Sequence, residues 1–173
     1  MLPRFTYEQP KTTVLNTIEE YLKGLDFKIA GQDLERPWGG FFVIDEGQTR
    51  KFIKLFFNQY TYDQIAKYGT KLSPKILVVE PTKRLSWQYH NRRAEIWTVL
   101  SGPVGVVISR DDNQTEIKSL PSDTTIQIEQ NIRHRLVGLD NSWGIVAEIW
   151  QHTDHNQPSD EHDIIRVEDD FGR

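Results

Sequence analysis

Four residues of this chain carry side chains that bind divalent metal ions, at a spacing that can bring them together. They are Gln88, His90, Glu95 and His134. On a β-strand, Gln88 and His90 project from the same face because they are two residues apart. If residues 91–94 form a tight connection, Glu95 begins the neighbouring strand and faces inward beside them. His134 follows a plausible turn at Gln130-Asn131 and begins a later strand.

This ligand set predicts one divalent metal ion inside a small β-barrel. Two imidazoles, a carboxylate and an amide oxygen suit zinc first, and also manganese, iron, cobalt or nickel. Each residue taken alone has a simpler interpretation, since a Gln-x-His pair is usually a polar pair at a strand edge and Glu95 could be a surface charge. The joint spacing Gln-x-His-x4-Glu-x6-Gly, which ends at Gly102, favours the metal site.

Composition limits the other function classes. The 173 residues fit one domain, and 37% hydrophobic with 27% charged residues is ordinary globular composition. The chain has no cysteine, which excludes disulfides and thiolate ligands. A formal charge of −4 gives no basic face for nucleic acid. We expect no membrane association and a cytoplasmic location, because there is no signal-peptide pattern and no apolar run near the ~20 residues that span a bilayer.

One helix precedes a series of strands. Apolar residues at three- and four-residue steps predict a helix on the outside of the barrel: Val14, Leu15, Ile18, Tyr21, Leu22 and Leu25. Thr12 or Thr13 is expected to cap it and Gly24 to end it. We therefore divide the chain into a helical extension, 1–35, and a barrel domain, 36–173.

About eleven short β-rich runs, separated by turn residues, predict an all-β sandwich or barrel. The runs are 27–30, 41–44, 51–57, 75–79, 85–90, 96–100, 104–109, 116–120, 124–128, 135–137 and 145–150. Residues 58–74 form a polar excursion with a helical turn expected at 63–68. In the acidic tail, 163–167 could add one more strand or an ordered strap.

The spacing of the four ligands resembles the first cupin motif, with Gln in place of the first His. More specifically, residues 36–173 resemble the C-terminal isomerase domain of type II phosphomannose isomerases, which is fused to mannose-1-phosphate guanylyltransferases. The matching stretches are Arg36-Pro37-Trp38-Gly39, Ile44-Asp45-Glu46-Gly47, 75–81, 85–97 with Ser101-Gly102, His134-Arg135-Leu136 and 163–173. The resemblance implies a cupin, a double-stranded β-helix or jelly-roll barrel.

The sequence departs from the family at several positions. His90-Asn91-Arg92 stands where a run of His is usual, Thr82 stands where Gly usually follows Pro, and the second cupin motif lacks its Pro and Gly. No nucleotidyltransferase domain or Gly-rich phosphate loop is present in this sequence, so we expect a stand-alone cupin. The four inferred ligands are kept.

The resemblance implies an aldose–ketose isomerase that interconverts mannose 6-phosphate and fructose 6-phosphate through an enediol, and it suggests a homodimer. Such a reaction needs a base and stabilisation of charge on the sugar oxygens. Cationic side chains are the candidates for the phosphate and for catalysis. We predict catalytic roles for Lys75, Arg93 and Arg166, and substrate binding by Lys75, Arg135 and Arg166. The base is not assigned, because Glu95 is used as a ligand.

Two other functions stay open. One is a non-catalytic cupin that binds a sugar or sugar phosphate, and the other is an iron dioxygenase on the same barrel. A second metal site formed by His152, His155 and His162 is disfavoured, because their irregular spacing in a Pro- and Asp-rich stretch is typical of a solvated loop. The five Trp are expected in the core or rim, with Trp87 on the strand face opposite Gln88.

Overall fold

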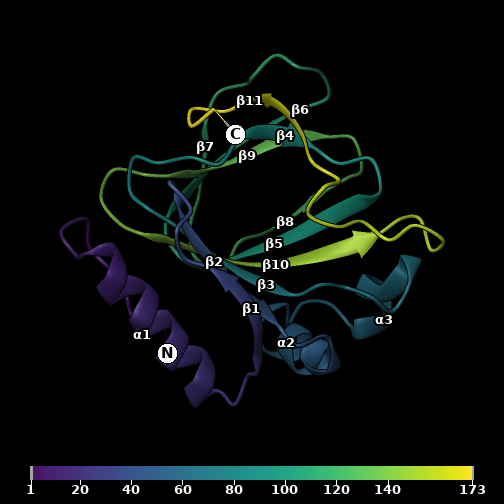
Figure 1. Ribbon diagram of the computed structural model, residues 1–173, viewed down its shortest axis with the longest axis horizontal. Helices are drawn as coiled ribbons and strands as arrows, with labels where there is room; N and C mark the ends of the chain where they lie inside the picture. Colours follow the sequence, from purple (N-terminus) through teal and green to yellow (C-terminus); the bar gives the residue numbers. More distant parts are fainter. Residues whose placement is uncertain (1, 173) are drawn as a thin grey trace.

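Two antiparallel sheets face each other in the computed structural model, which describes residues 2–172 (Figure 1). Met1 and Arg173, the outer limits of the two predicted regions, lie outside the described residues. The larger sheet has the order β1 (Ile29–Asp33), β2 (Gly39–Ile44), β3 (Lys75–Val79), β10 (Gly144–His152), β5 (Arg93–Ser101) and β8 (Thr125–Ile128). The smaller sheet has the order β11 (Ile165–Glu168), β4 (Trp87–Tyr89), β9 (Arg133–Gly138), β6 (Val104–Ser109) and β7 (Lys118–Leu120). The predicted all-β cupin fold with an N-terminal helix is confirmed.

The central strands of the larger sheet are buried on both faces, and this determines which polar side chains face inward. Residues of one alternating phase, including Ile76, Ile96 and Ile149, pack against the helices outside the sheet. Residues of the other phase, including Leu77 and Val146, pack between the two sheets. Because side chains alternate along a strand, the polar residues of the second phase must face the space between the sheets.

Helix α1 (Lys11–Gly24) covers the outer face of the larger sheet at β2 (Figure 1). Val14, Leu15, Ile18 and Leu22 are buried, as the apolar spacing predicts, and the helix ends at Gly24 as expected. The predicted Thr12 or Thr13 cap is wrong. Pro10 stands at the N-cap, without a side-chain cap, because the helix begins at Lys11 and places both threonines inside its first turn.

The predicted strand at 51–57 is a helix, α2 (Thr49–Phe56). Phe52, Ile53 and Phe56 recur at a helical spacing and bury one face, where Phe52 and Phe56 have ring centroids 4.9 Å apart. A short apolar run with aromatic and β-branched residues fits either period, and here the packing against the sheet decides for the helix. A 3-10 turn, Glu46–Gln48, precedes α2.

The excursion at 58–74 joins α2 to β3 and contains the helical turn that we predict. It forms α3 (Tyr62–Ile65) followed by a 3-10 turn (Ala66–Tyr68). Thr61 and Gln64 make a reciprocal capping box at its start.

Several strand limits differ from the prediction. The first strand begins at Ile29 because Phe27 packs into the core instead, and only Lys118–Leu120 of the run 116–120 pairs as a strand. Of the two possibilities for residues 163–167, a strand or an ordered strap, the structure has a strand, β11, which begins two residues later and pairs with β4. The boundary at residue 35 stays a prediction. In the part of the chain that is described, no helix has the length and hydropathy needed to cross a membrane.

Candidate metal centre

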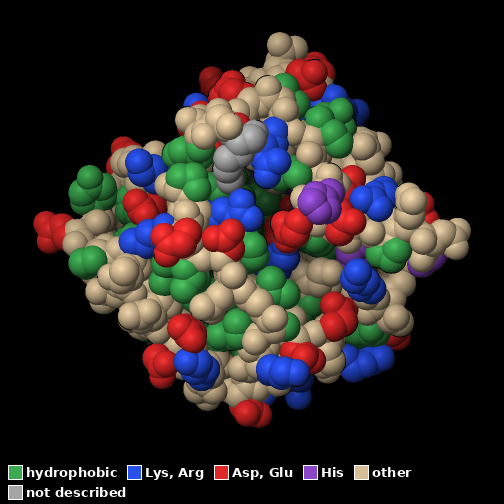
Figure 2. Space-filling view, in the orientation of Figure 1, with side chains coloured by type: hydrophobic (Ala, Val, Ile, Leu, Met, Phe, Trp, Pro, Cys, Tyr) green, Lys and Arg blue, Asp and Glu red, His purple; other side chains and the backbone are tan. Residues whose placement is uncertain are grey.

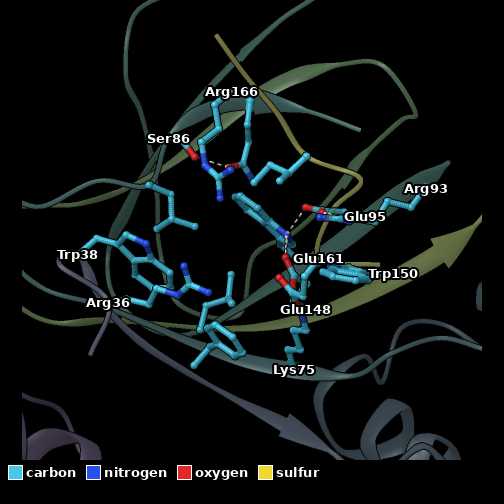
Figure 3. Close-up of a pocket in the computed structure, with 16 residues that line it drawn as sticks. Arg36, Trp38, Lys75, Ser86, Arg93, Glu95, Glu148, Trp150, Glu161 and Arg166 are labelled. Atoms are coloured by element: carbon cyan, nitrogen blue, oxygen red, sulfur yellow. Dashed lines mark hydrogen bonds and ion pairs between the residues drawn. The ribbon is translucent and has the colours of Figure 1, made fainter. Parts of the chain in front are cut away.

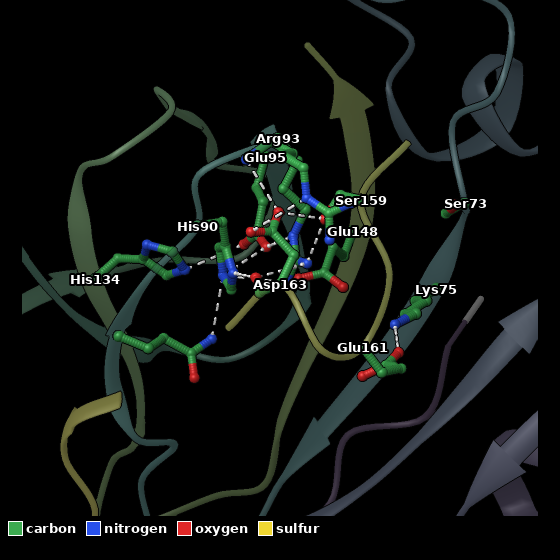
Figure 4. Close-up of polar contacts among 12 residues, drawn as sticks. Ser73, Lys75, His90, Arg93, Glu95, His134, Glu148, Ser159, Glu161 and Asp163 are labelled. Carbon is green, nitrogen blue, oxygen red and sulfur yellow. Dashed lines mark hydrogen bonds and ion pairs between the residues drawn. The ribbon is translucent and has the colours of Figure 1, made fainter. Parts of the chain in front are cut away.

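His90, Glu95 and His134 meet between the two sheets (Figure 4). His90 directly follows β4, Glu95 is the third residue of β5, and His134 is the second residue of β9. Nε2 of His90 lies 3.2 Å from one carboxylate oxygen of Glu95, and Nε2 of His134 lies 3.3 Å from the other. All three side chains are about 2% exposed, and their ligand atoms lie within 4.8 Å of one another. The arrangement brings together three of the four predicted ligands.

Backbone carbonyls fix which nitrogen of each imidazole is free. Nδ1 of His90 lies 2.6 Å from the carbonyl oxygen of Asp163, and Nδ1 of His134 lies 2.9 Å from that of Ile132. A carbonyl only accepts, so Nδ1 donates in both rings, and in the neutral ring Nε2 carries a lone pair. Both lone pairs therefore face an acidic side chain, and Nε2 of His134 is buried without a hydrogen-bond partner. A divalent cation between these atoms would satisfy all of them.

Gln88 lies beside the three, on β4 opposite His134 in the strand register. Its amide nitrogen is 3.5 Å from Nε2 of His90, and its oxygen accepts a 2.5 Å hydrogen bond from Ser86. Metal binding through the amide oxygen requires the two amide atoms to exchange places, which Ser86 permits because a hydroxyl also accepts hydrogen bonds.

Arg93 connects the cluster to its surroundings. Its Nε donates to Glu95 at 2.8 Å, and one Nη lies 3.1 Å from Nε2 of His90. Its guanidinium also lies over the ring of Trp150, 3.5 Å from the centroid. An ion bound to Nε2 of His90 would replace the Arg93 contact to that atom and leave the bond to Glu95 in place.

The electrostatics of the cluster favour the protonation states that a metal requires. Burial lowers the pKa of His90 to about 3, with the charge of Arg93 acting in the same direction, so the ring is neutral. Burial alone would raise the pKa of Glu95, but interactions with His90 and His134 when these rings are protonated, and with the permanently charged Arg93, outweigh burial and hold that pKa well below its usual range. A neutral imidazole and an ionised carboxylate are the metal-binding forms.

A cavity opens from this cluster between the sheets, and charged side chains surround its mouth (Figure 2). Its lining includes the predicted residues Lys75, Gln88, Arg93, Glu95 and Arg166, together with residues from other parts of the chain: Arg36, Trp38, Phe41, Leu77, Leu85, Ser86, Trp97, Glu148, Trp150, Glu161 and Ile164. Figure 3 shows Arg36 and Arg166 reaching into the space from different sides. The cavity holds only about 70 Å³, less than the roughly 300–1,000 Å³ of ordinary ligand pockets.

A cationic region at Lys75 lines the same cavity as Glu95 of the cluster. Lys75 is 5% exposed, and its Nζ lies 3.5 Å from the ring centroid of Trp150. It forms an ion pair with Glu161, whose side chain is 59% exposed at the mouth. A carboxylate from the tail thus covers Lys75.

Glu148 stands between the two regions. It is 5% exposed and is the strand partner of both Lys75 on β3 and Trp97 on β5. The indole Nε1 of Trp97 donates to Glu148 at 3.0 Å and to Glu95 at 3.1 Å. Burial, and then the negative charge of Glu95, raise the pKa of Glu148 to about 8.

The loop 159–163 folds over the cluster and is held by the same residues. Arg93 donates to the Ser159 hydroxyl at 2.9 Å and to the Asp160 carbonyl at 3.2 Å. The Asp163 carboxylate accepts the backbone N–H groups of Asn91 and Arg92 at 3.0 Å, so it also fixes the tight connection between β4 and β5.

The structure does not bring Arg135 to the cavity. It follows His134 on β9 and therefore projects to the other face of the smaller sheet, where it pairs with Glu168 at 3.0 Å. Trp87 packs with Val107 and Val137, away from Gln88 as expected. His152 is not in a solvated loop but ends β10, where it is buried and its Nε2 lies 3.0 Å from the Ser73 hydroxyl.

Sequence reasoning missed Glu148, Glu161, Arg36 and Asp163. Glu148 had a usable signal, because it is the one charged residue in the apolar run 145–150. Trp97 and Trp150, expected only in the core or rim, line the cavity.

Comparison with known protein families identifies the family of this chain. The sequence pattern of the family described as "Mannose-6-phosphate isomerase C-terminal" matches residues 49–169. The chain belongs to this family. Its relatives include the xanthan biosynthesis protein XanB of Xanthomonas campestris pv. campestris strain B100, 30% identical over 138 residues that cover 80% of this chain and 23% of XanB.

Other members give the same result. The alginate biosynthesis protein AlgA of Pseudomonas aeruginosa is 32% identical over 73% of this chain and 24% of its own length, and a mannose-1-phosphate guanylyltransferase of Salmonella montevideo is 25% identical over 84% and 24%. The chain thus spans about a quarter of these relatives. Among solved structures, vicilin from hazelnut, Corylus avellana, shares the fold with a TM-score of 0.52 at 14% identity, covering 75% of this chain and 32% of vicilin.

Proposed function

We propose that this family member is a metal-dependent sugar-phosphate isomerase that interconverts mannose 6-phosphate and fructose 6-phosphate. The observation that carries the proposal is the convergence of His90, Glu95 and His134 beside a cavity that Glu95 and Lys75 both line. Aldose–ketose isomerisation needs a cation at O1 and O2 and an anion-binding group further along the sugar. The cavity supplies candidates for both.

We propose zinc as the bound ion, with Gln88 as a fourth ligand after its amide turns. Two imidazoles and a carboxylate form a common zinc ligand set. When bound, a divalent ion there would polarise the sugar oxygens and stabilise the charge that grows on them. The bond from Arg93 would keep the Glu95 carboxylate aimed at the ion.

The phosphate would bind to Lys75 with help from Arg166, both of which line the cavity. Lys75 now faces the Glu161 carboxylate, an anion in the position that a phosphate oxygen would take. Because the enclosed space is smaller than a hexose phosphate requires, Glu161 and the loop that carries it must move outward for binding.

The test is an assay of the purified chain, stripped with a chelator and reloaded separately with Zn²⁺, Mn²⁺, Co²⁺, Ni²⁺ or Fe²⁺. Fructose 6-phosphate formed from mannose 6-phosphate is followed with coupling enzymes that produce NADPH, with His134→Ala as the metal-binding control. The proposal predicts turnover by the metal-loaded chain, loss on chelation and none in the control.

Metal-loaded protein that does not convert the sugar would refute the isomerase. A rise in melting temperature with mannose 6-phosphate but no turnover would identify a binding protein instead. Light scattering at several protein concentrations tests the homodimer, which stays a prediction.

A further inference from the structure

The cavity contains few groups that could move a proton. Its titratable lining residues, apart from the arginines, are Lys75, Glu95, Glu148 and Glu161. Arginine keeps its proton at all ordinary pH values and cannot act as a base. Glu95 is required as a metal ligand, Lys75 faces a carboxylate, and Glu161 is largely exposed at the mouth. Glu148 is the group left without another role.

The position of Glu148 is the second observation. Lys75, Glu148 and Trp97 stand side by side on β3, β10 and β5, as the strand register shows. Trp97 Nε1 bridges Glu148 to Glu95, so a single indole separates Glu148 from the proposed metal. Figure 3 shows Glu148 between Lys75 and Glu95, so a sugar that reached from the proposed metal site to Lys75 would lie beside Glu148.

We propose that the Glu148 carboxyl is the group that carries the proton between C1 and C2 of the sugar, an inference that rests on the isomerase function. In the forward direction the ionised form of Glu148, the minor form at neutral pH because burial raises the pKa of this carboxyl to about 8, takes the proton from C2. The C2–H electron pair becomes the C1–C2 double bond, and the carbonyl pair of C1 moves to O1. Glu148, now a carboxylic acid, returns the proton to C1. The hydroxyl proton of O2 passes to O1 as the C2 carbonyl forms, so no other reactant is consumed.

The environment of Glu148 suits this role. One oxygen accepts from Trp97, which fixes the plane of the carboxyl and leaves the other oxygen for the substrate. The side chain is 5% exposed, so little of the carboxyl is in contact with bulk water. The same carboxyl can therefore deliver to C1 part of the hydrogen that it removed from C2.

The experiment compares wild type, Glu148→Gln and the matched control Glu116→Gln, which changes an exposed carboxylate on the outer surface. Each protein is loaded with metal, its metal content is measured, and mannose 6-phosphate is supplied in D2O. Proton NMR then follows deuterium entering C1 of fructose 6-phosphate and C2 of mannose 6-phosphate, beside kcat and KM.

Glu148→Gln is expected to lower kcat by at least about 100-fold, the usual contribution of a positioned acid–base group, with KM and metal content near wild type. Deuterium exchange at both carbons falls in parallel. The amide still offers Trp97 an acceptor oxygen, so a purely structural Glu148 would leave kcat and exchange unchanged, and that result overturns the inference.

A second variant keeps the test valid if Glu148→Gln folds poorly. Glu148→Asp keeps the charge and shortens the reach by one methylene, and it should lose kcat while its melting temperature stays near wild type. If wild type is active and both Glu148→Asp and Glu148→Gln keep the full kcat, the role of Glu148 is overturned while the isomerase function stands. Inactive wild type overturns the isomerase and this inference together.

Discussion

Replacing Glu95 by glutamine in the metal-free protein removes the carboxylate that faces Arg93 inside the cavity. Arg93 is 4% exposed, and its remaining contacts carry no negative charge. They are the Ser159 hydroxyl at 2.9 Å, the carbonyls of Asp160 and Asp163 at 3.2 and 3.4 Å, Nε2 of His90 at 3.1 Å and the ring of Trp150. Breaking a buried ion pair by removing one partner costs about 3–5 kcal/mol. We expect a loss of about 3 kcal/mol, because the new amide can donate to Nε2 of His134 and recover part of the cost.

Urea unfolding in the presence of a chelator, followed by tryptophan fluorescence, measures this loss. For a chain of this size the melting temperature should fall by roughly 6–12 °C. The double variant Glu95→Gln with Arg93→Met should be less destabilised than Glu95→Gln alone, since it removes the stranded cation as well. A loss below about 1 kcal/mol in the single variant would refute the view of Arg93 and Glu95 as a structurally important buried pair.

Three further predictions concern the same cavity. In chelated protein, the free energy of unfolding should fall as pH drops from about 6.5 toward 3, because His90 takes up a proton in the unfolded chain before it does in the folded one, where its pKa is about 3. Urea unfolding at several pH values measures this, and the free energy of unfolding of His90→Asn should depend less on pH. Glu161→Gln should tighten binding of inorganic phosphate in calorimetry and Lys75→Met should abolish it, whereas equal affinity in wild type and Glu161→Gln would show that the carboxylate does not compete for Lys75. Gln88→Ala should weaken zinc binding less than His134→Ala, and the reverse order would contradict the ligand assignment.

The metal centre was the part of the site most accessible to sequence reasoning. Gln88 and His90 share a strand face by spacing alone, and the short connection that follows His90 keeps Glu95 close to both of them. His134 lies almost forty residues after Glu95; the turn at Gln130-Asn131 places it at the start of a strand, but local pattern does not say which strand it faces. The structure pairs Gln88 with His134 across β4 and β9, a long-range register that sequence periodicity does not encode.

The errors have specific physical causes. Phe52, Ile53 and Phe56 satisfy both a helical and a strand interpretation, and the choice is made by the sheet against which they pack. Arg135 was assigned to the substrate by its closeness to His134 in sequence, although adjacent residues of a strand face opposite ways. The hydrogen bonds from Asn91 and Arg92 to Asp163 join segments more than seventy residues apart, so no local sequence pattern predicts them.

The covering loop also has a consequence for how the protein is made. His90, Glu95 and His134 are all synthesised before residues 159–163, because translation proceeds from the amino end. Until that segment folds over the cluster, the three side chains lie in a hollow that is open on that side. An ion can enter at that stage without any opening of the covering segment. The hydrogen bonds of Arg93 and Asp163 then hold that segment in place over the ion.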